Sequence, residues 1–154
     1  MGLGPLILIS PLLLLAAYCD LRFLRIPNII SLAILAIFVV SVLIGTPADL
    51  MTRLLAAVVV FGLGFLAFAF RLIGGGDVKL LSALVLFVPT HGLTLFANLF
   101  SAALLVGVAS IIALRRSPSI SKVDWKSLSQ PKAFPMGLSI ALAGLTFPIA
   151  IGMA

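Results

Sequence analysis

The chain has 154 residues, of which 63% are hydrophobic and only 9% are charged. Soluble domains carry roughly 45–50% apolar and about 25% charged residues, so the composition excludes a soluble globular protein. It indicates one integral membrane domain over residues 1–154. The net charge of +6 does not indicate nucleic-acid binding, because the basic residues lie between apolar runs. The single cysteine, Cys19, excludes an intrachain disulfide and a multi-cysteine metal site.

Six apolar segments predict an all-α bundle of about six transmembrane helices, because a helix needs about 20 apolar residues to span the bilayer. No Lys or Arg precedes the first apolar run, which favours a retained helix over a cleaved signal peptide. The fourth segment is short. We expect it to begin within the glycines before it, to be tilted, or to lie partly inside the bundle; alternatively, it forms a re-entrant pair with the fifth. In chain order the segments are Leu3–Cys19, Ile29–Gly45, Leu54–Ile73, Val78–Val88, Leu93–Leu114 and Pro135–Met153.

The basic residues predict the orientation of the bundle. Six spans divide the connecting segments into two sets, one on each side of the membrane. One set carries nine cations and the other carries only Arg53. Basic residues concentrate in cytoplasmic loops, so the side with nine cations is expected to be cytoplasmic. The long basic loop from Arg115 to Phe134 is expected to lie along the anionic inner leaflet of the lipid bilayer. The nine cations on the expected cytoplasmic side are Arg22, Arg25, Arg71, Lys79, Arg115, Arg116, Lys122, Lys126 and Lys132.

Two aspartates fall at the expected cytoplasmic end. Asp20 ends the first span, and Asp77 precedes the fourth. A charged residue within a span costs roughly 2.5–3.5 kcal/mol, so acidic residues near membrane depth indicate function. The simpler interpretation is an interface residue paired with a neighbour, Asp20 with Arg22 and Asp77 with Lys79. Two facing carboxylates would hold one proton between them, so one can activate a water while the other donates to a scissile carbonyl. This favours aspartic-protease chemistry, with no metal and no other cofactor.

Several other residues have simpler interpretations or exclude other chemistries. Gly74–Gly76 carry no side chains, so an extended substrate segment could lie beside Asp77; a flexible turn would also explain them. Asp49 and Asp124 are interpreted as structural or solvated. His91 is the only histidine and lies in an expected outer turn. With no H-E-x-x-H and no G-x-S-x-G in the chain, zinc and serine protease chemistries are excluded.

Three stretches resemble the motifs of type IV prepilin peptidases, in the same order. "DLRFLRIPNII" (20–30) resembles the first motif, "GGGDVKLLSAL" (74–84) the G-x-G-D-x-K motif, and "FPMGLSIALAG" (134–144) the C-terminal P-x-G segment. Met136 stands where the family commonly has an aromatic residue. The short length resembles the TadV/CpaA-like branch, which serves Flp-type pili.

The resemblance implies a membrane GxGD aspartyl endopeptidase of the bacterial inner membrane. Such enzymes cut the short basic leader from prepilins at the cytoplasmic face. The resemblance implies that Asp20 and Asp77 are catalytic. Larger relatives carry a cysteine-rich zinc segment and also methylate the product; this chain lacks that segment, so methyl transfer is not expected. The further motif residues that the resemblance implies are Gly74, Gly75, Gly76, Lys79, Pro27, Asn28, Pro135 and Gly137.

Two alternatives remain from the sequence. Presenilin and signal peptide peptidase share G-x-G-D and the same chemistry, but "YCD" is only loosely similar to their first motif and no P-A-L follows. From another class, a small transporter or pilus-assembly subunit could use Asp20 and Asp77 as a proton or cation site. Loss of leader cleavage on mutation of either aspartate would separate a peptidase from a transporter.

Overall fold

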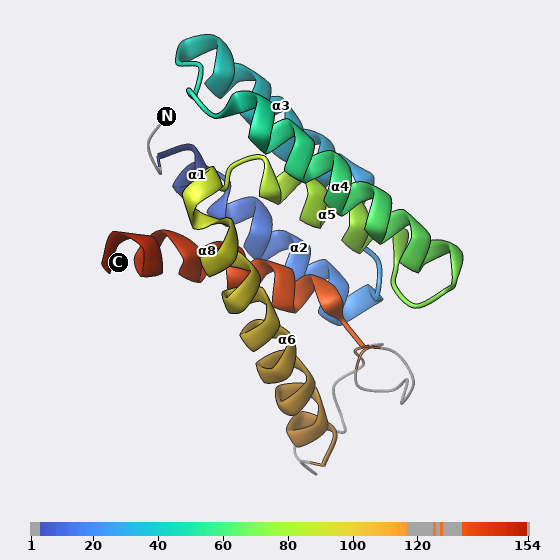
Figure 1. The fold of residues 1–154 in the computed structure, drawn as a ribbon. Coiled ribbons are helices and arrows are strands. Elements are labelled where there is room, and N and C mark those ends of the chain that lie inside the picture. Colours follow the sequence, from blue (N-terminus) through green and yellow to red (C-terminus); the bar gives the residue numbers. More distant parts are fainter. Residues whose placement is uncertain (1–3, 117–124, 126, 128–133, 154) are drawn as a thin grey trace.

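The computed structural model describes residues 4–116, 125, 127 and 134–153, and over these residues the fold is all-helical, as expected (Figure 1). The apolar runs form helices because a backbone in lipid must satisfy its own hydrogen bonds. The helices in chain order are α1 (Gly4–Leu8), α2 (Ser10–Phe23), α3 (Asn28–Ile44), α4 (Leu50–Ala69), α5 (Gly75–Val85), the 3-10 helix η1 (Thr90–Gly92), α6 (Leu93–Arg116) and α8 (Met136–Met153).

The first expected span is divided into α1 and α2 near a proline. Pro11 lies in the first turn of α2 and has no backbone N–H, so it interrupts the hydrogen-bond ladder. The second helix then continues to Phe23, four residues beyond the expected end at Cys19. As a consequence Asp20 lies within a regular helix rather than at its end.

Three helical segments in the described part of the chain are long and apolar enough to cross a membrane, namely Leu50–Ala69, Thr90–Leu114 and Met136–Met153. The apolar helix Asn28–Ile44 is shorter. With 11 residues, α5 has a length of roughly 16 Å, about half of the hydrocarbon thickness. It begins within the glycines and lies inside the bundle, as two of the expectations for the fourth segment predicted.

The short helix α5 occupies the middle of the bundle, with α4 on one side and α8 on the other (Figure 1). In turn α8 packs against α2, α5 and α6. Gly144 permits this close packing, because a Cβ there would lie 2.7 Å from Cδ1 of Leu13 and 3.0 Å from Cδ2 of Leu84. Because α8 touches both α2 and α5, it brings the helices that carry the two aspartates together.

The opposite end of the bundle is held by a polar network around Asp49. Its Oδ1 accepts a hydrogen bond from Nε of Arg53 at 2.8 Å, and its Oδ2 accepts from the backbone N–H and the hydroxyl of Thr90. The buried Arg53 also donates to the carbonyl oxygen of Phe87 at 3.2 Å. These bonds join the start of α4 to the segment between α5 and α6, so Asp49 has the structural role that its sequence context suggested. Asp124 lies outside the described residues.

Candidate active site

Asp20 lies on the buried face of α2. This face also carries Leu13, Ala16 and Ala17, at the spacing of one helical stripe, and Asp20 itself is only 5% exposed. The helix ends just beyond it, where Leu24 adopts the left-handed conformation with φ of 53°. The Leu24 N–H donates to the carbonyl oxygen of Asp20 at 2.8 Å, which closes the helix and turns the chain toward α3.

Asp77 lies in the first turn of α5. Gly74 caps this helix in an extended conformation, and its carbonyl oxygen accepts a hydrogen bond from the Asp77 N–H at 3.1 Å. A Cβ on Gly74 would lie 2.7 Å from Oδ2 of Asp77, so the glycine leaves room for the carboxylate. The other oxygen, Oδ1, is buried and accepts no hydrogen bond from any described residue. A buried polar oxygen without a partner is uncommon in folded proteins and marks this carboxylate as a candidate functional group.

The start of α8 reaches Asp20. The buried Pro135 precedes the helix, and the backbone N–H of Gly137 in the first turn donates to Oδ2 of Asp20 at 2.6 Å. A Cβ at position 137 would lie 2.9 Å from this oxygen and 3.0 Å from Cβ of Asp20. The residue here therefore has to be glycine for the backbone to come this close.

The two carboxylates come from different helices and lie within electrostatic reach of one another. Asp20 is buried, and Asp77 is partly exposed. Two like charges at short range in a largely apolar setting are difficult to ionise together. Of the two carboxylates, Asp20 is thus hydrogen-bonded to a backbone N–H, and Asp77 has one buried oxygen without a hydrogen-bond partner among the described residues.

Ile26 connects the three motifs, and the sequence reasoning did not identify it. A Cβ on Gly76 would lie 3.2 Å from Cβ of Ile26 and 3.4 Å from its carbonyl oxygen. A Cβ on Gly137 would lie 2.8 Å from Cδ1 of the same residue. The backbone that approaches Gly76 is therefore the chain's own. The available signal was position alone, since Ile26 directly precedes the Pro–Asn pair of the first motif.

The remaining motif residues surround this centre. Pro27 caps α3 with φ of −60°, and Asn28 begins that helix. Its Oδ1 accepts a hydrogen bond from Nζ of Lys79 at 3.0 Å. Gly75 opens α5 against α4, because a Cβ there would lie 3.3 Å from Cε2 of Phe68.

The simpler interpretation of the aspartates as paired interface residues finds no support in the part of the chain that is described. Lys79 contacts Asn28 rather than Asp77, and Arg22 donates to the hydroxyl of Tyr18 rather than to Asp20. The one ion pair among the described residues is Asp49–Arg53, at the other end of the bundle.

Comparison with known proteins agrees with this arrangement. The model of the type IV leader peptidase family matches residues 7–113, which is more than half of the chain. The matched region contains both aspartates, the three glycines, Lys79 and the Pro27–Asn28 pair, whereas Pro135 and Gly137 lie beyond it. No curated protein and no solved structure matches the chain. With this match over helices α2 to α6, the protein belongs to the type IV leader peptidase family.

Proposed function

We propose that this protein is an aspartyl endopeptidase that removes the short basic leader from Flp-type prepilins. Membership in the type IV leader peptidase family supports a leader-peptidase-like membrane protease. The finer assignment to Flp-type substrates follows from the resemblance of this short chain to the TadV/CpaA-like branch. The observation that carries the proposed chemistry is the approach of Asp20 and Asp77 in one largely buried site.

The unequal surroundings of the two carboxylates suggest their roles. Asp20 accepts the Gly137 N–H at 2.6 Å, and such a bond favours the ionised form. Asp77 has no comparable donor on Oδ1 among the described residues, so we assign the shared proton to it. In this proposal Asp20 is the general base and Asp77 is the general acid.

The reaction then balances with one water. Asp20 takes a proton from the water while the water oxygen attacks the scissile carbonyl carbon. At the same time Asp77 gives its proton to the carbonyl oxygen. The C–N bond of the resulting tetrahedral intermediate breaks as Asp20 passes its proton to the leaving nitrogen. Asp77 recovers a proton from the hydroxyl as the new carboxyl group forms. Neither a covalent intermediate nor a cofactor takes part.

The site is proposed to lie at the cytoplasmic face of the bacterial inner membrane. Arg22, Arg25, Arg71 and Lys79 lie at the end of the bundle that carries the aspartates, whereas Arg53 lies at the other. The positive-inside rule then places the aspartate end in the cytoplasm. Methylation of the product is not part of the proposal, and the partners are the prepilin and the bilayer.

The decisive experiment incubates the purified protein with a candidate Flp-type prepilin in lipid vesicles and determines the N-terminus of the product by mass spectrometry. We expect a single cut that releases the basic leader. A mature N-terminus without added methyl mass is expected even when a methyl donor is supplied. An intact prepilin after prolonged incubation with folded enzyme would contradict the proposal.

A further inference from the structure

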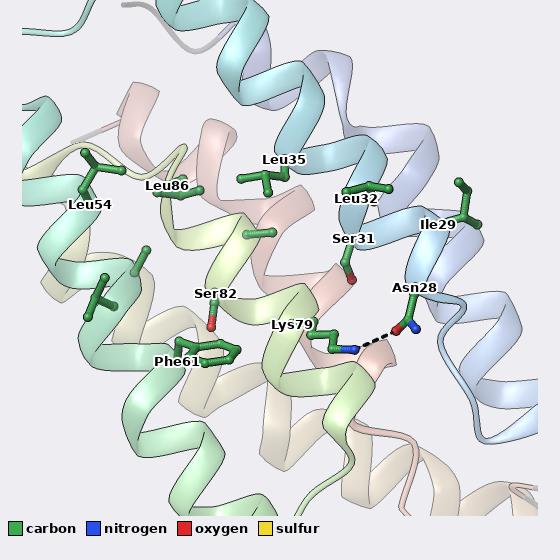
Figure 2. A pocket seen from close by; sticks show the side chains of 13 residues that line it. Asn28, Ile29, Ser31, Leu32, Leu35, Leu54, Phe61, Lys79, Ser82 and Leu86 are labelled. Atoms are coloured by element: carbon green, nitrogen blue, oxygen red, sulfur yellow. Dashed lines mark hydrogen bonds between the residues drawn. The ribbon is translucent and has the colours of Figure 1, made fainter.

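A groove of about 770 Å³ lies between α3, α4 and α5 (Figure 2). Its floor is one face of α5, formed by Lys79, Ser82 and Ala83, and it continues to Leu86 directly after the helix. At 100° per residue, Asp77 lies about 200° around the helix from Lys79, so the groove and Asp77 occupy opposite faces of α5. The walls are formed by Asn28, Ile29, Ser31, Leu32 and Leu35 of α3 and by Leu54, Ala57, Val58 and Phe61 of α4.

Small side chains distinguish this groove from an ordinary lipid-facing surface. Ala57, Ser82 and Ala83 lie along it, whereas Leu43 and Ile44 at the far end of α3 are more than 80% exposed and large. In membranes, small residues mark the surfaces where helices approach each other closely. A helix could therefore approach the floor of this groove closely.

Polar side chains gather at the end of the groove where α5 begins. Ser31 is 8% exposed and its hydroxyl has no hydrogen-bond partner among the described residues. Lys79 has three N–H donors and uses one of them on Asn28. Figure 2 shows Leu35, Leu54 and Leu86 at the opposite end of the groove.

A second groove offers a contrast. It has a volume of about 540 Å³ and lies between α4, α5 and α6. All of its lining residues are apolar or glycine, among them Val59, Leu63 and Phe100. Lipid chains can fill this purely apolar groove without leaving a polar group unpaired. The α3–α4–α5 groove instead contains hydrogen-bond donors, and a bound polypeptide could supply acceptors for them.

We propose that the α3–α4–α5 groove binds the part of the substrate that follows the cut. The resemblance to prepilin peptidases implies that this part is an apolar helix, and in the proposal it lies against Ala57, Ala83 and the leucines of the groove. The non-helical stretch before that helix places its carbonyl oxygens at Ser31 and Lys79. The chain then crosses the N-terminus of α5 at the exposed Gly74 to reach Asp77 on the other face.

This inference rests on the proposed function and names the surface that the substrate occupies. It also gives the exposed Gly74 a second role besides leaving room for the Asp77 carboxylate, because a side chain there would stand in the path of the crossing chain. The substrate cannot cross at Gly76, because Ile26 already packs against that glycine.

Photo-crosslinking tests the location directly. A benzoylphenylalanine replaces Leu32 or Phe61 in the groove, or Leu66 outside both grooves on α4, in Asp77→Asn protein that holds its substrate uncut. Leu66 is 55% exposed and Phe61 is 46% exposed, so the probes have similar access to the bilayer. With a candidate Flp-type prepilin we expect crosslinks from the two groove positions to the apolar segment after the leader. Crosslinks from Leu66 alone would overturn the proposal.

Filling the groove gives an independent measurement in active protein. Val58→Trp places a large ring in the groove, and Leu55→Trp places the same ring on the same helix outside it; these side chains are 67% and 58% exposed. If overpacking the bound complex costs what it costs in a core, Val58→Trp lowers the cleavage rate by about tenfold or more. Leu55→Trp is expected to cleave within about twofold of the wild type, as surface changes usually do.

The outcomes separate the two proposals. If the wild type cleaves and both tryptophan variants cleave at equal rates, the groove is not the substrate site, and the peptidase assignment is unaffected. A prepilin that folded wild-type protein does not cut would contradict the proposed function, and the groove assignment would fall with it.

Discussion

The backbone N–H of Gly137 donates a hydrogen bond to Oδ2 of Asp20 over 2.6 Å, although 117 residues separate them in the chain. Through this contact the first turn of α8 holds the position of a buried carboxylate and favours its ionised form. The free N–H groups and the positive end of the helix dipole both favour an anion here. No such donor reaches Oδ1 of Asp77 from the described residues, and the difference between the two carboxylates underlies the mechanism proposed above.

Gly137→Ala is expected to reduce cleavage strongly. The added Cβ would lie 2.9 Å from Oδ2 of Asp20 and 2.8 Å from Cδ1 of Ile26, so α8 has to move away from the carboxylate. Overpacking costs about 1–3 kcal/mol, which corresponds to about 5–150-fold in rate if it acts on the transition state. Gly152→Ala in the same helix is the control, because a Cβ there has no atom within 4 Å. Similar rates for the two variants would show that the close approach is unimportant.

The two aspartates are expected to act as one unit. If they share one proton and one water, removal of either carboxylate disables the same step, and losses within a catalytic unit are strongly non-additive. Asp20→Asn and Asp77→Asn should each abolish measurable cleavage, and the double variant should be no worse than either single one. Chelators and serine-directed reagents should leave the wild-type rate unchanged, because the mechanism uses carboxylates and water.

The matched controls for this prediction are Asp49→Asn and Asp124→Asn, which should cleave at close to the normal rate. Each variant is first shown by size-exclusion chromatography and thermal unfolding to be folded, since a polar change inside a membrane bundle can act through stability. A folded Asp20→Asn or Asp77→Asn protein that still cuts at the wild-type rate would refute the mechanism.

Much of the architecture follows from local pattern. Each apolar run is helical, although the first is divided into α1 and α2, and the glycines before Asp77 mark the start of α5. Residue type and position indicated Asp20 and Asp77, whereas Lys79 and Asn28 followed from the resemblance to the family motifs. The structure places all four around the same end of α5.

Other features depend on contacts that no local pattern encodes. An apolar residue suits both lipid and protein interior, so only the short length of the fourth apolar run, and not its hydropathy, indicated that α5 lies inside the bundle. The contact of Ile26 with both Gly76 and Gly137 joins three distant segments. The pairing of Arg22 with Tyr18, and not with Asp20, depends on which way each side chain leaves α2. These relationships arise only once the helices are packed.

The network at Asp49 predicts a pH-dependent stability. Burial acts to raise the pKa of Asp49, but hydrogen bonds from Thr90 and Arg53 outweigh it and lower the pKa from 3.8 to about 2. A lowered folded-state pKa stabilises the fold above the unfolded value, and this contribution is lost as pH falls from about 4 to about 2. Asp49→Asn should therefore lower the thermal unfolding midpoint near pH 7.

The comparison across pH provides the control for this effect. The difference in midpoint between wild type and Asp49→Asn should shrink as the pH is lowered through that window, because the wild-type carboxylate becomes protonated. A difference that stays constant from pH 7 to pH 2 would mean that the side chain acts through packing and not through its charge.

Cys19 reports which side of the membrane the aspartates face. It precedes Asp20 on α2 and its thiol is neither disulfide-bonded nor fully buried. If the aspartate end is cytoplasmic, a membrane-impermeant thiol reagent should not label Cys19 in intact cells and should label it in inverted membrane vesicles. Because Cys19 is the only cysteine in the chain, a Cys19→Ser variant gives the background for both measurements. Labelling in intact cells that exceeds this background would invert the topology and exclude cleavage at the cytoplasmic face, whatever the activity of the purified enzyme.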